Sequence, residues 1–343
     1  MIDILILFIA ASLLLYVLLG GSDFGAGIVE LLPAGRFRES QKQVINRAMG
    51  PVWEANHMWL ILIVVILFMG FPAIFTTLMT ALHLPTLALL VGIVVRGAVF
   101  TFRHYDAIQE PRSQRVYTWL FGLSSLWTAL WLGIIAASLN RGIINPATRE
   151  VWGAWFAPWW GLYPLAVGVF VACIYAFLAS IYLVGETEEP ELKRRFVRLA
   201  AWFNGLVVLS GGFVFLASLT ERESLATTFL RNPLNLAVVA LATLLFIVLW
   251  VFVAQRRTML TRIVASGQVA LILLGWYVLY APNALITAVG PLNFYSEAAP
   301  PATLRQLVIA LLVGGIFIFP SLYYLFRVFK MSHRTDSSRS GRG

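Results

Sequence analysis

Residues 50–60 read GPVWEANHMWL and run directly into an uncharged stretch that extends to residue 82. An apolar stretch of that length predicts a membrane-spanning helix. Glu54, Asn56 and His57 then lie at the helix entrance, where Trp53 and Trp59 flank and support them. A carboxylate in such a place is costly unless it is paired, hydrated or able to carry a proton. Glu54 and His57 are three residues apart and share one helix face, so the pattern indicates proton handling inside a membrane.

The composition is that of a polytopic membrane protein. The chain has 343 residues, of which 60% are hydrophobic and 12% charged, with a mean hydropathy of +0.83. Soluble domains carry about 25% charged residues. The single cysteine, Cys173, lies in an apolar run and excludes a disulfide framework or a CxxC site. No two of the four histidines have the spacing of a zinc site, so the sequence predicts no metal site and no catalytic residue of its own.

The hydrophobic pattern predicts an all-α fold with nine transmembrane helices in a single transmembrane domain, residues 1–331. The expected spans are 4–22, 56–80, 84–103, 116–138, 161–184, 199–219, 234–254, 261–280 and 304–328, most of them near the ~20 residues needed to cross a bilayer. The tail, residues 332–343, is rich in Ser, Arg and Gly, and we expect it to be disordered and cytoplasmic.

Basic residues alternate between the connecting segments. The segments after the first, third, fifth and seventh helices, together with the tail, hold 19 of the 25 Lys and Arg residues. The positive-inside rule therefore places the N-terminus outside and the tail in the cytoplasm of a multi-pass cell membrane protein. Because the net charge of +9 follows this topology, we do not expect a nucleic-acid partner.

The two halves of the chain show a weak internal sequence repeat. Residues 16–20 (YVLLG) end the first predicted helix, and residues 182–185 (YLVG) end the fifth. Each is followed by an acidic stretch, a basic loop and a helix that bears an asparagine, Asn56 or Asn204. Two four-helix units of the same orientation plus one extra helix fit this pattern. Chance similarity between two apolar sequences is the alternative.

Three charged residues, Asp23, Glu54 and Arg96, are predicted to lie in the inner half of the membrane. Asp23 follows the glycine-rich end of the first helix, and Glu30 lies seven residues later, on the same face if the helix continues. Arg96 is the one basic residue well inside a predicted span. An isolated buried arginine is strongly disfavoured, so we expect Arg96 to pair with Glu54 or Asp23. A proton or ion pathway is the favoured interpretation. Structural ion pairs that fix helix packing are the alternative, and for His57 an orienting hydrogen bond is favoured over metal ligation.

The same residues carry a family resemblance. Residues 16–27 (YVLLGGSDFGAG), 50–60 (GPVWEANHMWL) and 95–103 (VRGAVFTFR) resemble, in order and spacing, the signature segments of subunit II of cytochrome bd-type quinol oxidases. The second segment is the most specific. The likeness covers nearly the whole chain, although the C-terminal half matches mainly in topology.

The resemblance implies a partner, subunit I, which binds haem b together with haem d (or a second type of haem b) and oxidises quinol. Such complexes of bacterial and archaeal membranes reduce dioxygen to water with cytoplasmic protons. Subunit II itself binds no haem, scaffolds subunit I and lines a proton path. The family's acids match Asp23 and Glu54, and its arginine matches Arg96. A small single-helix subunit, quinone and lipid are further expected partners.

Two positions depart from the family pattern. Many relatives carry an acid at the place of Gly20 and another at the place of Thr101. The proton path expected here therefore consists of Glu54, Asp23, Thr101 and His57, with Arg96 as the charge partner and Glu54 as the main carrier.

Two other functions are compatible with the sequence. A stand-alone secondary transporter could use Asp23, Glu54 and Arg96 as its coupling site, although the confinement of these charges to the first half favours the oxidase. The second alternative function is that of a structural paralogue, which keeps the fold but conducts no protons. A haem in this chain is disfavoured, because His83, His104 and His333 lie at helix ends, in a loop or in the tail, and only His57 is plausibly placed.

Overall fold

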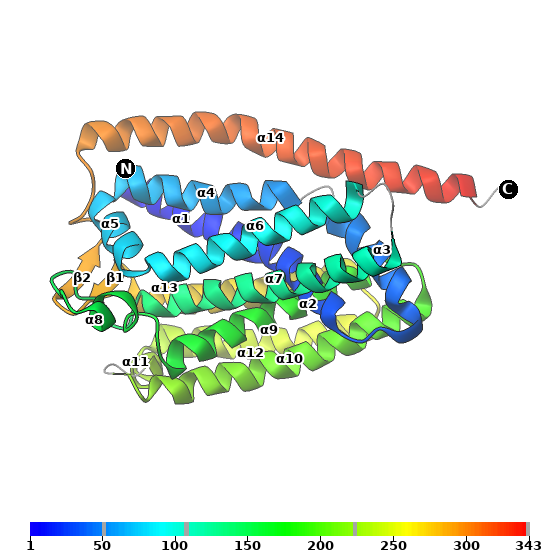
Figure 1. The fold of residues 1–343 in the computed structure, drawn as a ribbon, viewed down its shortest axis with the longest axis horizontal. Coiled ribbons are helices and arrows are strands. Elements are labelled where there is room, and N and C mark those ends of the chain that lie inside the picture. Colours follow the sequence, from blue (N-terminus) through cyan, green and yellow to red (C-terminus); the bar gives the residue numbers. More distant parts are fainter. Residues whose placement is uncertain (50–52, 106–109, 222–224, 341–343) are drawn as a thin grey trace.

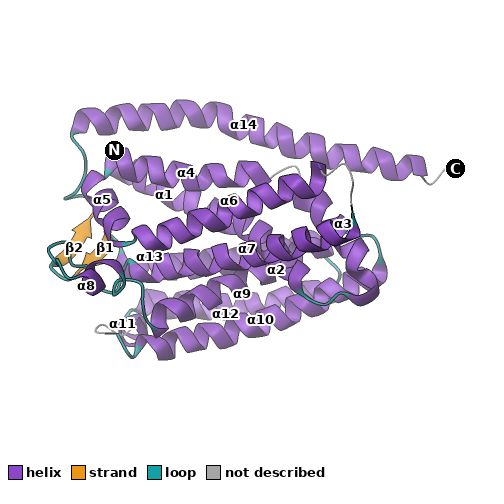
Figure 2. Cartoon of the chain, in the orientation of Figure 1, coloured by secondary structure: helices purple, strands orange, loops and turns teal. Residues whose placement is uncertain are grey.

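Long helices run side by side through most of the chain (Figure 1). The computed structural model describes residues 1–49, 53–105, 110–221 and 225–340. Some side chains within helices, among them those of Glu54 and His104 and all those beyond residue 324, lie outside the described part. Within it, the chain is mostly helical, with helices long and apolar enough to cross a membrane and one short hairpin (Figure 2).

The elements alternate long helices with short connectors. Those of the first half are α1 (Ile2–Leu15), η1 (Tyr16–Gly20, a π-helical turn), α2 (Gly21–Leu31), η2 (Gly35–Phe37, 3-10), α3 (Arg38–Met49), α4 (Trp53–Gly70), α5 (Pro72–Ala81), α6 (His83–Tyr105) and α7 (Pro111–Ser138). Those of the second half are α8 (Val151–Trp155), α9 (Leu162–Val184), α10 (Pro190–Ser218), α11 (Leu225–Arg231), α12 (Pro233–Ala254), α13 (Thr258–Tyr280), β1 (Asn283–Thr287), β2 (Gly290–Asn293) and α14 (Pro301–Ser340).

Eight helices of the described part are long and apolar enough to cross a membrane, or nine if the bent pair α4–α5 counts as one span. The count of nine and the arrangement as two four-helix units plus one helix therefore stay predictions, as do the domain boundary at residue 331 and the disorder of 332–343. The helix α14 extends to Ser340, beyond the predicted end of the last span at 328. An antiparallel hairpin, β1–β2, was not anticipated from the sequence.

The first span is longer than predicted. Instead of ending at residue 22, the helix continues through the π turn to Leu31. The glycines of this segment allow close backbone approach rather than breaking the helix. A Cβ atom built on Gly25 would lie 1.8 Å from the backbone oxygen of Tyr175 in α9, and small residues permit such contacts between membrane helices.

The second span, predicted as one helix over 56–80, is broken at Phe71. The two parts are bent by 119°. Because a proline disfavours helical geometry in the residue before it, Phe71 leaves the helix and Pro72 begins α5. The carbonyl of Gly70 accepts a hydrogen bond of 2.8 Å from the backbone N–H of Ala299, just before α14.

The sequence predicts a loop for the basic segment after the first span, but this segment forms the helix α3. One side of α3 is buried through Gln41 and Ile45, each 1% exposed. The Gln41 amide donates to the carbonyl of Val29 at 3.2 Å and accepts from Arg195 Nε at 3.0 Å. These bonds connect α3 to the ends of α2 and α10.

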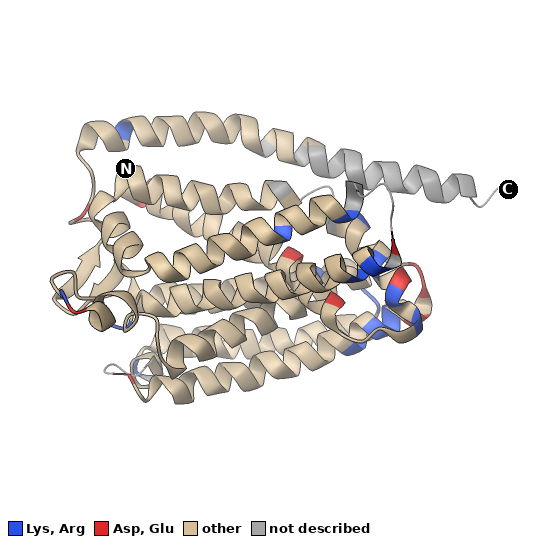
Figure 3. Ribbon diagram, in the orientation of Figure 1, with Lys and Arg blue, Asp and Glu red and all other residues tan. Residues whose placement is uncertain are grey.

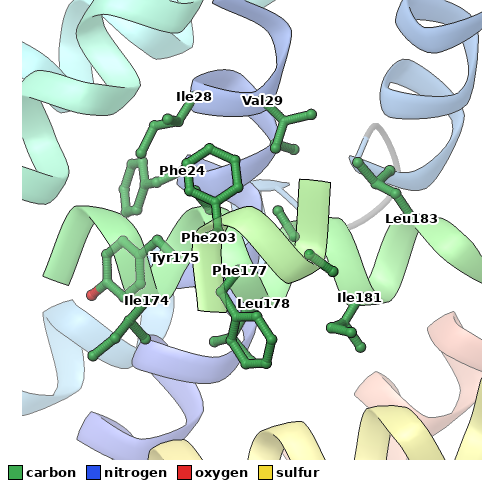
Figure 4. Close-up of a cluster of buried hydrophobic side chains, with 14 of the residues drawn as sticks. Phe24, Ile28, Val29, Ile174, Tyr175, Phe177, Leu178, Ile181, Leu183 and Phe203 are labelled. Carbon is green, nitrogen blue, oxygen red and sulfur yellow. The ribbon is translucent and has the colours of Figure 1, made fainter. Parts of the chain in front are cut away.

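The main core lies among α2, α9 and α10 (Figure 4). Phe24 of α2 stacks on Tyr175 of α9, with ring centroids 6.2 Å apart. Phe196 and Phe203 of α10 belong to the same cluster. This packing fixes α2 and with it the position of the acidic residues that α2 carries.

The two ends of the bundle differ in charge (Figure 3). Blue segments gather at the basic end, where α2 ends and α3 lies (Figure 3). Arg38 and Lys42 belong to α3, and Arg103 pairs with Glu30 near the end of α2. The hairpin end, where β1, β2 and α8 lie, holds few. The N-terminus is at the hairpin end and the C-terminus at the basic end (Figure 1).

We predict that Gly25→Ala lowers the free energy of unfolding by about 1–3 kcal/mol, the usual cost of an overpacked core, because the added methyl group collides with the backbone of α9. Thermal denaturation of the detergent-purified protein measures the change. Gly212→Ala is the matched control, since a Cβ there meets nothing within 4 Å. Equal melting temperatures for the two variants would contradict the assignment of Gly25 to a close helix contact.

Candidate functional site

Two buried ion pairs join α2 to α6. Arg96 Nη2 lies 2.6 Å from Asp23 Oδ1, and both side chains are 1% exposed. Arg103 lies two turns further along α6, and its Nη2 and Nη1 atoms are 2.8 and 2.9 Å from the two carboxylate oxygens of Glu30. Both pairs lie where the chain is surrounded by protein, so neither carboxylate is left as an isolated buried charge.

The pairs form because both helices carry the same spacing. Asp23 and Glu30 are seven residues apart, as are Arg96 and Arg103. Seven residues make nearly two turns of helix, about 10.5 Å at 1.5 Å per residue. Since the numbers rise together, α2 and α6 run in the same direction. We call the four side chains the ion-pair ladder.

The helix α7 packs against both helices and supplies the surroundings of the ladder. The Phe121 ring lies between the two guanidinium groups, 4.8 Å from that of Arg96 and 5.6 Å from that of Arg103. Arg96 Nε also donates to Ser125 Oγ at 3.1 Å. Cation–π contacts of this kind gain strength where water is excluded, so α7 orients both arginines.

Polar contacts continue from the ladder to the basic end. Lys42 of α3 donates to the side-chain oxygen of Gln114 at 2.9 Å, and Gln114 donates to the carbonyl of Arg103 at 3.4 Å. Burial, helped by the neighbouring Arg103 guanidinium, lowers the pKa of Lys42. The Glu30–Arg103 pair of the ladder is therefore connected to α3 through Gln114.

The entrance of α4 lies beside the ladder. Asn56 is buried and its Nδ2 donates to the carbonyl of Leu19, in the π turn, at 3.4 Å. The His57 ring packs among the rings of Phe24 and Trp53, with centroids 6.0 and 6.5 Å away. Trp59 is buried in the main core. Glu54 is the second residue of α4, but its side chain lies outside the described residues.

The two positions that depart from the family pattern behave differently. A Cβ built on Gly20 would lie 3.2 Å from the Tyr16 ring, so the ring of Tyr16 occupies the space next to that position. Thr101 is exposed and donates to the carbonyl of Gly97 at 3.0 Å. Its side chain takes no part in the buried ladder, and its role in proton transfer stays a prediction.

Arg96 was expected to pair with Glu54 or Asp23, and the ion pair in the structure is with Asp23. The Glu54 side chain lies outside the described residues. The pairing of Glu30 with Arg103 is not among the predictions made from the sequence. The signal was available: a second arginine seven residues after Arg96 matches a second acid seven residues after Asp23.

Neither metal nor haem ligation is supported by the described residues. They contain no group of three or more His, Cys, Asp or Glu side chains suited to a metal ion. His83 is close to the hairpin end, with its Nδ1 2.9 Å from the carbonyl of Thr80 and its ring against Trp155. His57 is enclosed by aromatic rings, including that of Tyr16 at 6.4 Å. The expectation that this chain binds no haem stays a prediction.

Comparisons with known proteins agree on one family. The family model described as cytochrome bd terminal oxidase subunit II matches residues 1–329. The chain is 23% identical to the cytochrome bd ubiquinol oxidase subunit 2 of Bacillus subtilis (strain 168), over 97% of each chain. It is 21% identical to the putative cytochrome bd menaquinol oxidase subunit II of the same strain, over 93% of each. The bd oxidase structure from Geobacillus thermodenitrificans shares the fold, with a TM-score of 0.75 over 95% of this chain and 98% of that one at 20% identity.

We predict that Arg96→Leu destabilises the protein by about 3–5 kcal/mol, because it leaves the Asp23 carboxylate buried and unpaired. The double variant Asp23→Leu with Arg96→Leu should recover much of the loss, since it removes both charges. Thermal unfolding in detergent compares the variants, and Arg36→Leu, which breaks the exposed pair with Glu191, is the control with little effect. If the double variant were as unstable as Arg96→Leu, the ion pair would not explain the loss.

Proposed function

We propose that this chain, which belongs to the cytochrome bd terminal oxidase subunit II family, scaffolds a haem-bearing subunit I and lines a proton path that enters from the basic end of the bundle. Its curated relatives are subunits of cytochrome bd quinol oxidases, which are oxidoreductase complexes. The chain is thus an enzyme component, and the haems, the quinol site and the reduction of dioxygen to water are assigned to the partner. Which quinol is used is left open, since the two named relatives differ in this respect.

The observation that carries the proposal is the line of buried charges that starts at the basic end. Glu30 with Arg103 comes first, Asp23 with Arg96 follows about 10 Å deeper, and α4 begins beside them with Glu54 at its second position. The concentration of cations at this end supports a cytoplasmic orientation by the positive-inside rule. Protons would then enter from the cytoplasm, with the N-terminus on the opposite side.

The three acids are suited to different tasks. Asp23 and Glu30 are each held by an arginine, and protonating either would leave a buried guanidinium unpaired, at considerable cost. We therefore assign them to the scaffold and to the electrostatic field of the path. Glu54 is the acid that we assign to proton transfer. A structural paralogue without proton traffic remains the competing function, and the pairing of both acids on α2 is the observation that favours it.

The face of α14 between Ile309 and Ile318 is the surface that we assign to subunit I. The first turns of α14 pack on α1 and α4 through Leu304 and Leu307. Beyond them, Ile316 and Phe317 are 70% and 69% exposed. Lipid could cover such a face, but α14 forms an outer layer of the bundle on the side opposite α10 (Figure 1), which leaves it free for a second subunit.

Cross-linking tests this surface. A photoreactive amino acid at Ile316 should give a covalent product with subunit I in native membranes, whereas the same group at Leu209 on α10, which is 71% exposed, should not. The products are identified by mass spectrometry. Cross-linking from Leu209 and none from Ile316 would move the interface to the other side of the bundle.

The proton path is tested by Glu54→Gln in the assembled complex. We expect quinol oxidation to slow several-fold while the haem-bearing partner still co-purifies, because glutamine keeps the shape but cannot carry a proton. A pull-down with a reduced-minus-oxidised visible spectrum establishes assembly, and oxygen consumption gives the rate. Glu191→Gln, at the exposed surface, is the control. An assembled Glu54→Gln complex with normal turnover and proton uptake would favour the structural paralogue.

A further inference from the structure

The spacing of the ion-pair ladder extends one step further along the first span. Tyr16 precedes Asp23 by seven residues, as Asp23 precedes Glu30. In α6 the residue seven before Arg96 is Leu89, which is apolar and buried. The ladder therefore continues on α1–α2 as a polar group, while α6 offers no cation at the matching position.

Tyr16 begins the π turn that precedes α2, on the side of Asp23 away from the basic end. Its side chain is 1% exposed, and its ring lies edge-on to Phe24 at a centroid distance of 6.3 Å. The ring also rests against Gly20 at the other end of the π turn. Such π turns inside α-helices are frequently found at functional sites. The hydroxyl group has no hydrogen-bond partner among the described residues.

His57 reaches the same place from α4. The bond from Asn56 to Leu19 fixes the start of α4 against the π turn, so the neighbouring His57 ring lies 6.4 Å from that of Tyr16. Asp23 and Arg96 are the described charged groups within electrostatic range of both His57 and the Tyr16 hydroxyl. Among the aromatic neighbours, Phe24 and Trp53 carry no charge, and Tyr175 of α9 is a further titratable group that faces Tyr16.

Four buried polar atoms in this region lack a partner among the described side chains and backbone. They are Tyr16 Oη, Asp23 Oδ2, His57 Nδ1 and Arg96 Nη1. Buried polar atoms that protein groups do not satisfy are commonly satisfied by ordered water, which makes about three hydrogen bonds each. These four atoms would supply the polar partners that a buried water needs.

We propose that Tyr16 and His57 are proton-relay residues, which hold ordered water beside the Asp23–Arg96 pair and extend the path beyond the ladder toward the middle of the membrane. The inference rests on the proposed function in proton uptake. A neutral imidazole accepts a proton at one nitrogen and releases one at the other, and a phenol both donates and accepts hydrogen bonds. Each group takes up one proton and passes one on, so its charge is unchanged after a transfer, and the ring tautomer or hydroxyl orientation is reset before the next proton arrives.

The test uses Tyr16→Phe and His57→Gln in the complex with subunit I, reconstituted in liposomes. We expect oxygen-reduction turnover to fall several-fold in either variant, because one proton-transfer group is lost, and the solvent deuterium isotope effect on turnover to rise. The double variant should be no slower than the slower single variant, because both act in one chain of transfers. His57→Gln should also remove a titration step from the pH profile of turnover.

Tyr182→Phe is the matched control, because Tyr182 ends the corresponding helix of the second half and its hydroxyl is paired with Ser266 at 2.7 Å. This variant should keep the wild-type rate and isotope effect. The visible spectrum of the co-purified haems confirms that each complex is assembled. If His57→Gln fails to assemble, Tyr16→Phe, which removes only one oxygen atom, decides the question.

Glu54→Gln, measured in the same series, distinguishes a failure of the relay assignment from a failure of the proposed function. If Glu54→Gln slows turnover while Tyr16→Phe and His57→Gln do not, the relay assignment is wrong and the proposed function stands. If all three variants keep the wild-type rate and isotope effect, both are wrong. Slow turnover in all three, with the raised isotope effect, supports both.

Discussion

The arrangement of the first half of the chain depends on satisfying two carboxylates that would otherwise be buried and unpaired. One ion pair between α2 and α6 would fix a distance but would leave the helices free to rotate about it. Two pairs separated by seven residues on each helix also fix the rotation and the axial register. A shift of one turn would break both pairs at once, and α7, with Phe121 between the guanidinium groups, has only one position that suits both.

Most of this architecture could be predicted from the sequence, because the membrane imposes simple rules. Spans follow from uncharged length, and a buried arginine requires a partner, which correctly pointed to Asp23 as one of two candidates. The shared face of Asp23 and Glu30 also followed from their spacing once the helix was allowed to continue. These are local or pairwise constraints, and they can be evaluated without knowing which helices are neighbours.

The features that were missed depend on tertiary contacts. The glycines at 20–27 could equally break a helix or let another approach, and only the presence of α9 decides between these outcomes. Pro72 is a local sequence signal for the break at Phe71. The Gly70 carbonyl at this bend, however, accepts its hydrogen bond from Ala299, more than two hundred residues later. The surroundings of Tyr16 could not be foreseen, because they are assembled from a π turn and the start of α4.

The bond between Gly70 and Ala299 has a consequence for how the chain is synthesised. The carbonyl of Gly70 is the last of α4, and its hydrogen-bond donor is the backbone N–H of Ala299, in the segment just before α14. During translation the second span therefore stays incomplete at one end until nearly the whole polypeptide has left the ribosome. A chain that terminates before Ala299 leaves the Gly70 carbonyl, at the corner between α4 and α5, without this partner.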